Sequence, residues 1–290
     1  MLERFSAKKP LTIRVNTLKA SVDDVLGCFD GFGLKYRQVS WYPEALILED
    51  IVPEQLAATA LLEQGKIYIQ NLASMLVPVI LAPQPGDLVL DLCAAPGSKT
   101  TQMADMMENK GKIVCVENIR GRFYKLKSVI ALLGAGEVCE PCCVDGRRFR
   151  SSSGELFDKI LVDAPCSSEG RFQLADKKTL AFWSLRKIKE MQKKQKGLLL
   201  SASRFLKPGG TLVYSTCTFA PEENESVVDW LLRKTDGVLK VVPWDMEGVS
   251  RYPAIQSWNE KVFHPQVQDC GRVLPDGNMD GFFITKLRKE

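Results

Sequence analysis

Histidine is almost absent from this chain: His264 is the only one among 290 residues. A Ser-His-Asp triad or a cysteine–histidine pair needs an imidazole as its base, so catalysis must instead rest on Cys, Asp, Lys or a cofactor. Long apolar runs are also lacking, because charged residues interrupt each run well before the roughly 20 residues of a membrane-spanning helix. The first ten residues contain no apolar signal core, so we expect a cytoplasmic protein that does not contact a membrane.

The cysteine pattern argues against disulfides and against a metal. Nine cysteines are an odd number, and several lie inside apolar runs, which favours free thiols in a reducing compartment. Cys139, Cys142 and Cys143 form a cluster that suggests a metal site. Zinc, however, usually needs two spaced ligand pairs or a pair combined with histidines. We therefore expect no metal and interpret the cluster as part of a buried strand.

Positive charge is concentrated in one segment. The net charge is only +4, but residues 171–207 contain eleven Lys or Arg against two acids. Such a run is typical of the solvated face of a helix, and it is also the electrostatic pattern of a protein that contacts a phosphate backbone. The sequence leaves both interpretations open.

Residues 1–70 predict a small N-terminal α/β domain. Residues 11–16 and 46–48 are β-like, and residues 21–32 have the pattern of a helix with a serine cap and two acids in its first turn. No repeat or low-complexity linker follows this region. We place the boundary at residue 71, where the pattern changes.

Residues 71–290 predict a larger domain in which strands alternate with helices. The strand candidates are residues 88–92, 113–117, 137–144, 159–163, 211–215 and 281–287. The helical stretches are residues 99–107, 120–133, 185–205 and 222–234. This alternation indicates a parallel sheet covered on both faces, so we expect an α/β, Rossmann-like doubly wound fold. Ligands of such folds bind beyond the carboxyl ends of the strands.

A turn of small residues follows the first of these strands. It comprises Cys93, Ala94, Ala95, Pro96, Gly97, Ser98 and Lys99. Small side chains let a ligand approach the backbone, and the free N–H groups of a helix N-terminus suit an anion. The spacing matches neither GxGxxG nor a Walker loop. The turn therefore indicates either a nucleoside pocket of another kind or an ordinary strand-to-helix connection.

Carboxylates follow the next three strands. They are Glu117, Asp145 and Asp163. An acid at the end of the second strand can accept hydrogen bonds from ribose hydroxyls. Each acid alone could be a cap or turn residue, but the repeated placement favours a set that holds ribose, the adenine edge and the reacting centre.

Two cysteines leave adjacent strands beside this pocket. Cys166 comes three residues after Asp163, and Cys217 comes two residues after Ser215. A single cysteine is usually buried and inert. Two cysteines at these positions indicate chemistry that uses thiols.

In these segments the chain resembles the Sun (Fmu) family of RNA cytosine-5 methyltransferases. Similar segments occur along nearly the whole chain, at residues 14–19 (RVNTLK), 70–75 (QNLASM), 208–210 (PGG) and 280–283 (DGFF). The resemblance implies a monomeric RNA-binding enzyme that uses S-adenosylmethionine. It also implies a methyltransferase sheet as the catalytic domain and a small N-terminal domain that positions tRNA or rRNA.

The resemblance assigns a role to each candidate residue. S-adenosylmethionine would be held by residues 93–99, Glu117, Asp145 and Asp163, with Arg122 supporting that site. Cys217 would be the nucleophile that adds to carbon 6 of cytosine, so that carbon 5 can accept the methyl group. Asp163 would hydrogen-bond the base, and Cys166 would assist product release.

Two residues depart from the family pattern, which usually has glycine at both places. Ser98 should be tolerated if its φ is negative, whereas Ser168 is expected to narrow the pocket for the target base. Neither change removes a reacting group.

Three other functions are weaker interpretations of the same residues. A DNA cytosine-5 methyltransferase would use Cys166 as nucleophile and leave Cys217 and residues 14–19 unexplained. A small-molecule methyltransferase would need neither thiol. A non-catalytic RNA-binding assembly factor with this fold would not need the intact cysteine pair.

Overall fold

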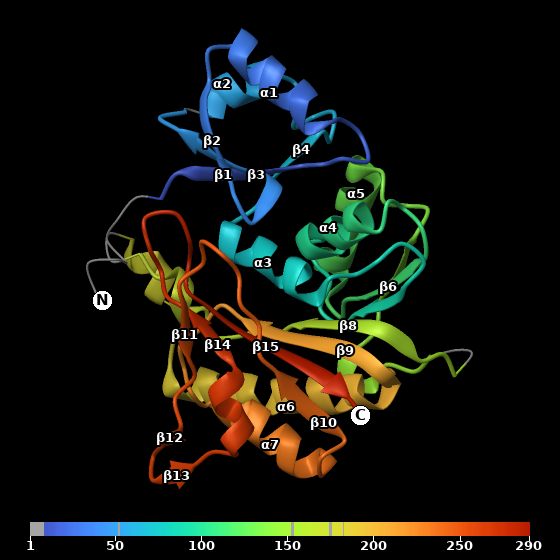
Figure 1. Cartoon of the computed structure of the whole chain (residues 1–290), viewed down its shortest axis with the longest axis vertical. Helices are drawn as coiled ribbons and strands as arrows, with labels where there is room; N and C mark the ends of the chain where they lie inside the picture. Colours follow the sequence, from blue (N-terminus) through green and yellow to red (C-terminus); the bar gives the residue numbers. More distant parts are fainter. Residues whose placement is uncertain (1–8, 52, 152–153, 174–175, 182) are drawn as a thin grey trace.

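The computed structural model describes residues 9–51, 53–151, 154–173, 176–181 and 183–290. It contains a small N-terminal sheet and a larger sheet, with helix α3 (Leu72–Leu81) packed between them (Figure 1). Among the described helices, none combines the length and apolarity needed to cross a membrane.

The N-terminal unit is an antiparallel sheet of four strands in the order β2-β3-β1-β4. Its elements are β1 (Leu11–Val15), α1 (Val22–Gly31), β2 (Lys35–Val39), β3 (Tyr42–Glu49), α2 (Pro53–Ala58) and β4 (Ile67–Ile69). The predicted serine cap is confirmed, because Ser21 and Asp24 exchange hydrogen bonds between side chain and backbone. The sequence did not predict β2, since most of this edge strand is exposed and its apolar pattern is weak.

The larger sheet contains the predicted parallel strands, in the order β9-β8-β5-β6-β7. Its parallel strands are β5 (Leu88–Asp91), β6 (Lys112–Val116), β7 (Cys139–Cys142), β8 (Phe157–Asp163) and β9 (Leu206–Thr216). The connecting helices are α4 (Ser98–Met106), α5 (Arg120–Leu133), α6 (Leu185–Phe205) and α7 (Glu225–Thr235). The predicted α/β, doubly wound arrangement is therefore confirmed in the centre of the sheet.

The prediction of an entirely parallel sheet was wrong at the last strand. Strand β15 (Phe282–Lys289) pairs with β9 in antiparallel orientation. Its other edge pairs with β14 (Gly271–Val273) and β10 (Leu239–Val242), also antiparallel. A loop without a crossover helix joins β14 to β15, so the chain reverses direction there. Beyond β14 the sheet ends in β11 (Arg251–Pro253), and β12 (Ser257–Trp258) forms a separate hairpin with β13 (Lys261–Val262).

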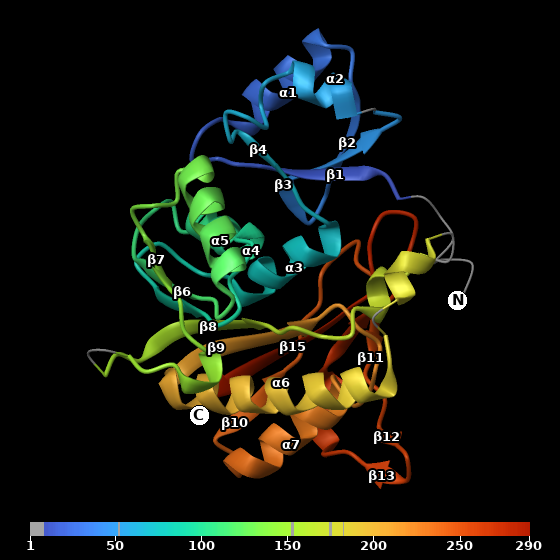
Figure 2. The same ribbon diagram turned by 180° about the vertical axis from the view of Figure 1, so that it is seen from behind.

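Successive residues of the central strands face opposite helical layers. Val89 and Val213 pack with helices α3, α4 and α5, whereas their neighbours Leu90 and Leu212 pack with α6 and α7. The two layers lie on opposite faces of the sheet in both views (Figure 2). Both faces are thus covered, which explains why the strands are apolar runs rather than alternating ones.

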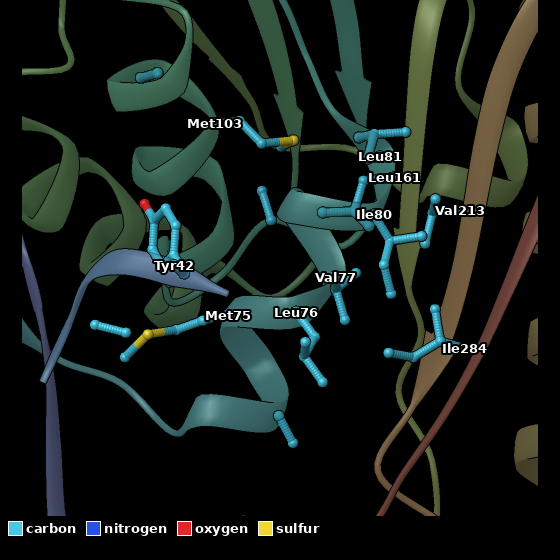
Figure 3. Close-up of a cluster of buried hydrophobic side chains, with 14 of the residues drawn as sticks. Tyr42, Met75, Leu76, Val77, Ile80, Leu81, Met103, Leu161, Val213 and Ile284 are labelled. Atoms are coloured by element: carbon cyan, nitrogen blue, oxygen red, sulfur yellow. The ribbon is translucent and has the colours of Figure 1, made fainter. Parts of the chain in front are cut away.

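Helix α3 contacts both sheets. Eight of its ten residues are buried, as expected for a helix that is apolar around its whole circumference. Met75 points toward Tyr42 of the N-terminal sheet, while Ile80 lies near Val213 of the larger sheet (Figure 3). The helix therefore joins the two units through one continuous apolar cluster.

The RVNTLK segment fixes the N-terminal unit to the larger domain. The Arg14 guanidinium lies 2.8 Å from the Asp105 carboxylate and donates to the Thr101 hydroxyl at 3.1 Å, both on α4. The Asn16 side chain donates to the backbone carbonyl of Leu133, at the end of α5, at 2.9 Å. Arg14 and Asn16 are fully buried, so this part of the segment holds the two units together.

Candidate active site

Strands β8 and β9 bring Cys166 and Cys217 together. The two strands are parallel neighbours, with Asp163 opposite Ser215 in the register. Cys166 follows β8 by three residues and Cys217 directly follows β9, and the two sulfur atoms are 3.3 Å apart. The thiols are free, so one can donate a hydrogen bond to the other.

The contact between the thiols favours ionisation of Cys217. Donation by Cys166 lowers the pKa of Cys217 and raises the pKa of Cys166. Burial opposes the ionisation of Cys217, and so does the negative charge of Asp163, whereas the Ser168 hydroxyl and the positive charge of Arg171 promote it. Because the thiolate is the nucleophilic form, this direction favours Cys217 over Cys166 as a nucleophile.

Asp163 lies at the end of β8 with its carboxylate held at both oxygens. One oxygen is 2.6 Å from the ammonium nitrogen of Lys99, and the other accepts a hydrogen bond from the Ser215 hydroxyl at 2.7 Å. The Lys99 ammonium also lies 5.5 Å from the ring centroid of Phe282. The first turn of α4 and the strand that precedes Cys217 therefore fix the orientation of this acid.

The small-residue turn joins β5 to α4. Gly97 has a φ of +113°, and a Cβ added there would lie 3.1 Å from the side chain of Val129. The positive φ favours glycine at this position, and a larger residue would also have to displace Val129 slightly. Ser98 begins the helix and does not have a positive φ, so the condition for its tolerance is met. Burial raises the pKa of Asp91, which precedes the turn, to about 7.

Two further acids follow β6 and β7. The Glu117 carboxylate is 3% exposed and lies 3.4 Å from the guanidinium of Arg122. Arg122 also donates to the backbone carbonyl of Ala95 at 2.5 Å, which ties this acid to the small-residue turn. Asp145 accepts hydrogen bonds from the Arg147 guanidinium, and these lower the pKa of Asp145.

Two cavities meet at Cys217. The first, of about 310 Å³, is lined by Leu92, Cys93, Ala95, Glu117, Asn118, Arg122, Asp145, Gly146, Arg147, Asp163, Ala164, Pro165, Cys166, Ser168, Lys194, Leu198 and Cys217. The second, of about 320 Å³, is lined by Tyr68, Ile69, Gln70, Asn71, Ser74, Asp91, Cys93, Ala94, Ala95, Pro96, Ser98, Lys99, Arg122, Asp163, Ala164, Arg171, Cys217, Asp280 and Phe282. The residues that border both cavities are Cys93, Ala95, Arg122, Asp163, Ala164 and Cys217.

The predicted cofactor residues divide between these cavities. Those that line the first are Cys93, Ala95, Glu117, Arg122, Asp145 and Asp163. Those that line only the second are Ala94, Pro96, Ser98 and Lys99. Gly97 lines neither cavity and packs against α5. The small-residue turn thus separates two spaces instead of enclosing one.

Residues that the sequence analysis did not single out hold the two cysteine loops together. The hydroxyls of Ser167 and Thr218 are 2.7 Å apart, which connects the loop of Cys166 to the loop of Cys217. The buried Glu223 carboxylate accepts from the backbone N–H of Ser167 at 3.1 Å and from the side chain of Gln195 at 2.8 Å. Burial raises the pKa of Glu223 to about 6. These residues come from distant segments, so no local pattern marks them.

Helix α6 places one lysine of the basic segment at the site. It starts from the carboxyl edge of the sheet, and Lys194 lines the first cavity while pairing with Glu190 at 2.6 Å. Lys189 and Lys193 are exposed, and neither forms an ion pair with any described residue. Around the cysteine cluster of β7, and elsewhere in the described part of the chain, no group of three or more His, Cys, Asp or Glu is arranged to hold a metal.

Comparison with known families agrees with this architecture. A family model described as 16S rRNA methyltransferase RsmB/F matches residues 78–288. This chain belongs to the RsmB/F methyltransferase family. The resemblance to Sun proteins is thereby confirmed. A second family model, the ferredoxin-like domain of RsmF/B-like methyltransferases, matches residues 1–55, which include most of the N-terminal sheet.

Curated RsmB/F relatives act on two kinds of RNA. A tRNA (cytosine(49)-C(5))-methyltransferase from Pyrococcus abyssi is 37% identical over 287 residues, which cover 97% of this chain and 89% of the relative. Ribosomal RNA small subunit methyltransferase F from Klebsiella pneumoniae is 39% identical over 293 residues, which cover 98% of this chain. This chain spans only 58% of the length of that relative.

Solved structures extend the similarity to the whole fold. A methyltransferase homolog from Pyrococcus horikoshii superposes with a TM-score of 0.84 at 33% identity, covering 99% of this chain and 89% of the other. NSun6 from Pyrococcus horikoshii, solved with SFG, has a TM-score of 0.80 at 25% identity, covering 99% of this chain and 93% of the other. The RsmB/F fold found here is therefore shared over nearly its full length.

Proposed function

We propose that this RsmB/F family member transfers a methyl group from S-adenosylmethionine to carbon 5 of a cytosine in tRNA or rRNA. The observation that carries the proposal is the position of Cys217, which borders both cavities and lies 3.3 Å from Cys166. One cavity can hold the methyl donor and the other the base, with the nucleophile between them. A methyltransferase for small molecules would have no use for this pair.

The first cavity suits S-adenosylmethionine. Its buried Glu117 carboxylate is placed to accept from ribose hydroxyls, and Asp145 to accept from the adenine edge. Together with Asp163, these acids also suit the positive charge of a sulfonium. The relative NSun6 was solved with SFG, an analogue of this cofactor. When bound, S-adenosylmethionine supplies an electrophilic methyl group.

The residues of the site divide the remaining chemistry. The Cys217 thiolate forms a bond to carbon 6 of the cytosine, which makes carbon 5 nucleophilic enough to accept the methyl group. Asp163, oriented by Lys99 and Ser215, hydrogen-bonds the ring nitrogen and exocyclic amine and stabilises the charge that develops on the base. Cys166 or a water molecule then takes the proton from carbon 5, and the electron pair left behind re-forms the double bond to carbon 6 as the Cys217 sulfur leaves as a thiolate. Cys166 is close enough to the departing sulfur to assist this step.

We assign catalysis and the positioning of the RNA to different domains. Residues 71–290 form the catalytic domain, and residues 1–70 position the RNA together with the exposed lysines of α6. The burial of Arg14 and Asn16 means that these two residues act by holding the domains together. The RNA therefore contacts exposed side chains instead, such as that of Ile69, which lines the second cavity.

Transfer of a radioactive methyl group tests the proposed reaction. RNA from cells that lack the gene is separated into tRNA and rRNA and incubated with the enzyme and labelled S-adenosylmethionine. We expect label in one fraction, no label with Cys217→Ala, and a single cytosine identified by bisulfite sequencing. Transfer to DNA alone would favour a DNA methyltransferase, and RNA binding without transfer would favour an assembly factor.

The salt dependence of RNA binding tests the contribution of α6. Lys189→Gln combined with Lys193→Gln should weaken RNA binding and flatten its salt dependence. With fewer phosphates contacted by lysine, binding releases fewer counterions from the RNA. The matched control replaces Lys234 and Lys240, which lie toward the opposite edge of the sheet. An equal effect of both pairs, or none from the α6 pair, would remove α6 from the RNA interface.

A further inference from the structure

Ser168 occupies a backbone conformation that its side chain disfavours. Its φ of 64° and ψ of 28° lie in the left-handed region, which costs an L-residue more than it costs glycine. Backbone hydrogen bonds of the neighbouring residues hold the segment around Ser168 in place. Gly170 donates to the backbone carbonyl of Cys217 at 2.9 Å, and Gly281 donates to the carbonyl of Gly170 at 3.1 Å. A Cβ on Gly170 would lie 2.2 Å from the carbonyl oxygen of Gly281, so the segment fits closely against the residue that precedes β15.

The hydroxyl of Ser168 points into the reacting centre. The Cys217 thiol donates to its oxygen at 3.6 Å, and the sulfur of Cys166 lies 3.9 Å from the same oxygen. The hydroxyl does not cap the short helix η3 (Glu169–Arg171) that follows, although Ser168 occupies the cap position. A serine at a position suited to glycine therefore places a hydroxyl, which can accept or donate, beside both sulfurs.

A thiolate at Cys217 gains from a further hydrogen-bond donor, because the nearby charges do not all favour it. The Asp163 carboxylate, which pairs with Lys99, still disfavours a thiolate at Cys217. Arg171 contributes a positive charge from η3, and Cys166 contributes one S–H donor. A hydroxyl is a stronger donor than a thiol, and hydrogen bonds to a charged acceptor are about twice as strong as neutral ones.

We propose that the hydrogen bond between Cys217 and Ser168 reverses when Cys217 ionises, so that the Ser168 hydroxyl donates to the sulfur and increases the thiolate population of the free enzyme. The role of that thiolate in methyl transfer rests on the function proposed above. The hydrogen bond itself does not, because it forms before RNA or cofactor binds. Ser168 thus sets the reactivity of the nucleophile, and the departure from glycine has a chemical consequence.

Two variants separate the hydroxyl from the backbone. Ser168→Gly removes the hydroxyl and relieves the left-handed conformation, whereas Ser168→Ala removes the hydroxyl and keeps the strain. Cys217 is alkylated with iodoacetamide across a pH series without RNA or cofactor, and its peptide is quantified by mass spectrometry. Cys28 in the N-terminal unit is partly exposed and serves as the internal control.

We expect both variants to slow alkylation of Cys217 at pH 7 by about threefold to tenfold, with the midpoint of the pH profile raised and Cys28 unchanged. Unchanged profiles in both variants would overturn the proposal. So would a loss in Ser168→Ala alone, because the backbone would then be the cause. Methyl transfer by the unmodified enzyme is measured separately, so failure of the proposed function is distinguished from failure of this hydrogen bond.

Discussion

Arg14 and Asp105 form an ion pair that is cut off from solvent, with side-chain exposures of 0% and 2% and a distance of 2.8 Å. The pair connects β1 of the N-terminal unit to α4, the helix that follows the small-residue turn of the site. A buried charge that loses its partner is costly. The arrangement of the two units therefore depends on this contact.

Replacing one member of the pair should strongly destabilise the protein. We expect Arg14→Met to lower the free energy of unfolding by about 3–5 kcal/mol, because the buried Asp105 carboxylate loses its counter-charge and keeps only the hydrogen bond from Thr17. Denaturant unfolding measures the loss. Arg37→Met is the matched control: Arg37 forms an exposed pair with Glu49 at 3.8 Å, and its loss should cost at most about 1 kcal/mol. Equal losses in the two variants would contradict the importance of burial.

The two cysteines should give opposite phenotypes. Cys217→Ala should abolish methyl transfer and any covalent adduct with RNA, because no thiolate can then activate the base. In Cys166→Ala the addition can still occur, but release slows, so an adduct that survives denaturation should accumulate on gels. The reverse pattern, with an adduct trapped by Cys217→Ala, would make Cys166 the nucleophile.

Loss of the Glu117 carboxylate should weaken cofactor binding. We expect Glu117→Ala to reduce the affinity for S-adenosylmethionine by about 1–3 kcal/mol, since charge-assisted hydrogen bonds to the ribose are lost. Titration calorimetry measures the change. Glu140→Ala, an exposed acid on neighbouring β7, controls for loss of charge. Unaltered affinity in Glu117→Ala would remove this residue from the site.

Glu223 should make stability depend on pH. Its pKa is raised from 4.5 to about 6 by burial, so the folded protein binds this proton more tightly than the unfolded chain does. Stability from this group is therefore fully present below pH 4.5 and is lost as the pH rises to about 6, by about 2 kcal/mol.

Glu223→Gln should remove that loss. The wild-type and variant free energies of unfolding, measured from pH 4.5 to 7, should diverge as the pH rises, with the variant falling less. Asp91, whose pKa burial raises to about 7, contributes equally to both proteins. Glu137→Gln changes an exposed acid and should follow the wild-type profile. Parallel profiles for wild type and Glu223→Gln would show that Glu223 does not titrate in this range.

Local patterns in the sequence were sufficient for most elements of the larger domain. The apolar runs at β5 and β8 and the periodicity of α6 depend on neighbouring residues, whose spacing the sequence displays directly. The same holds for candidate residues at strand ends. Parallel strands in a doubly wound fold present their carboxyl ends at one edge, so Glu117, Asp163 and Cys217 could be assigned to one region.

The tertiary structure alone decided which of these residues touch. The direction of β15, the contact between Cys166 and Cys217, and the link from Glu223 to Ser167 join segments that lie far apart in the chain. In the sequence, Arg14 belongs to a motif that resembles one of an RNA-binding family, which suggests contact with RNA. In the fold, however, Arg14 is buried against α4. Short-range patterns encode backbone preference and the side of an element that is buried. Distances between distant side chains depend on how layers pack, which no local pattern contains.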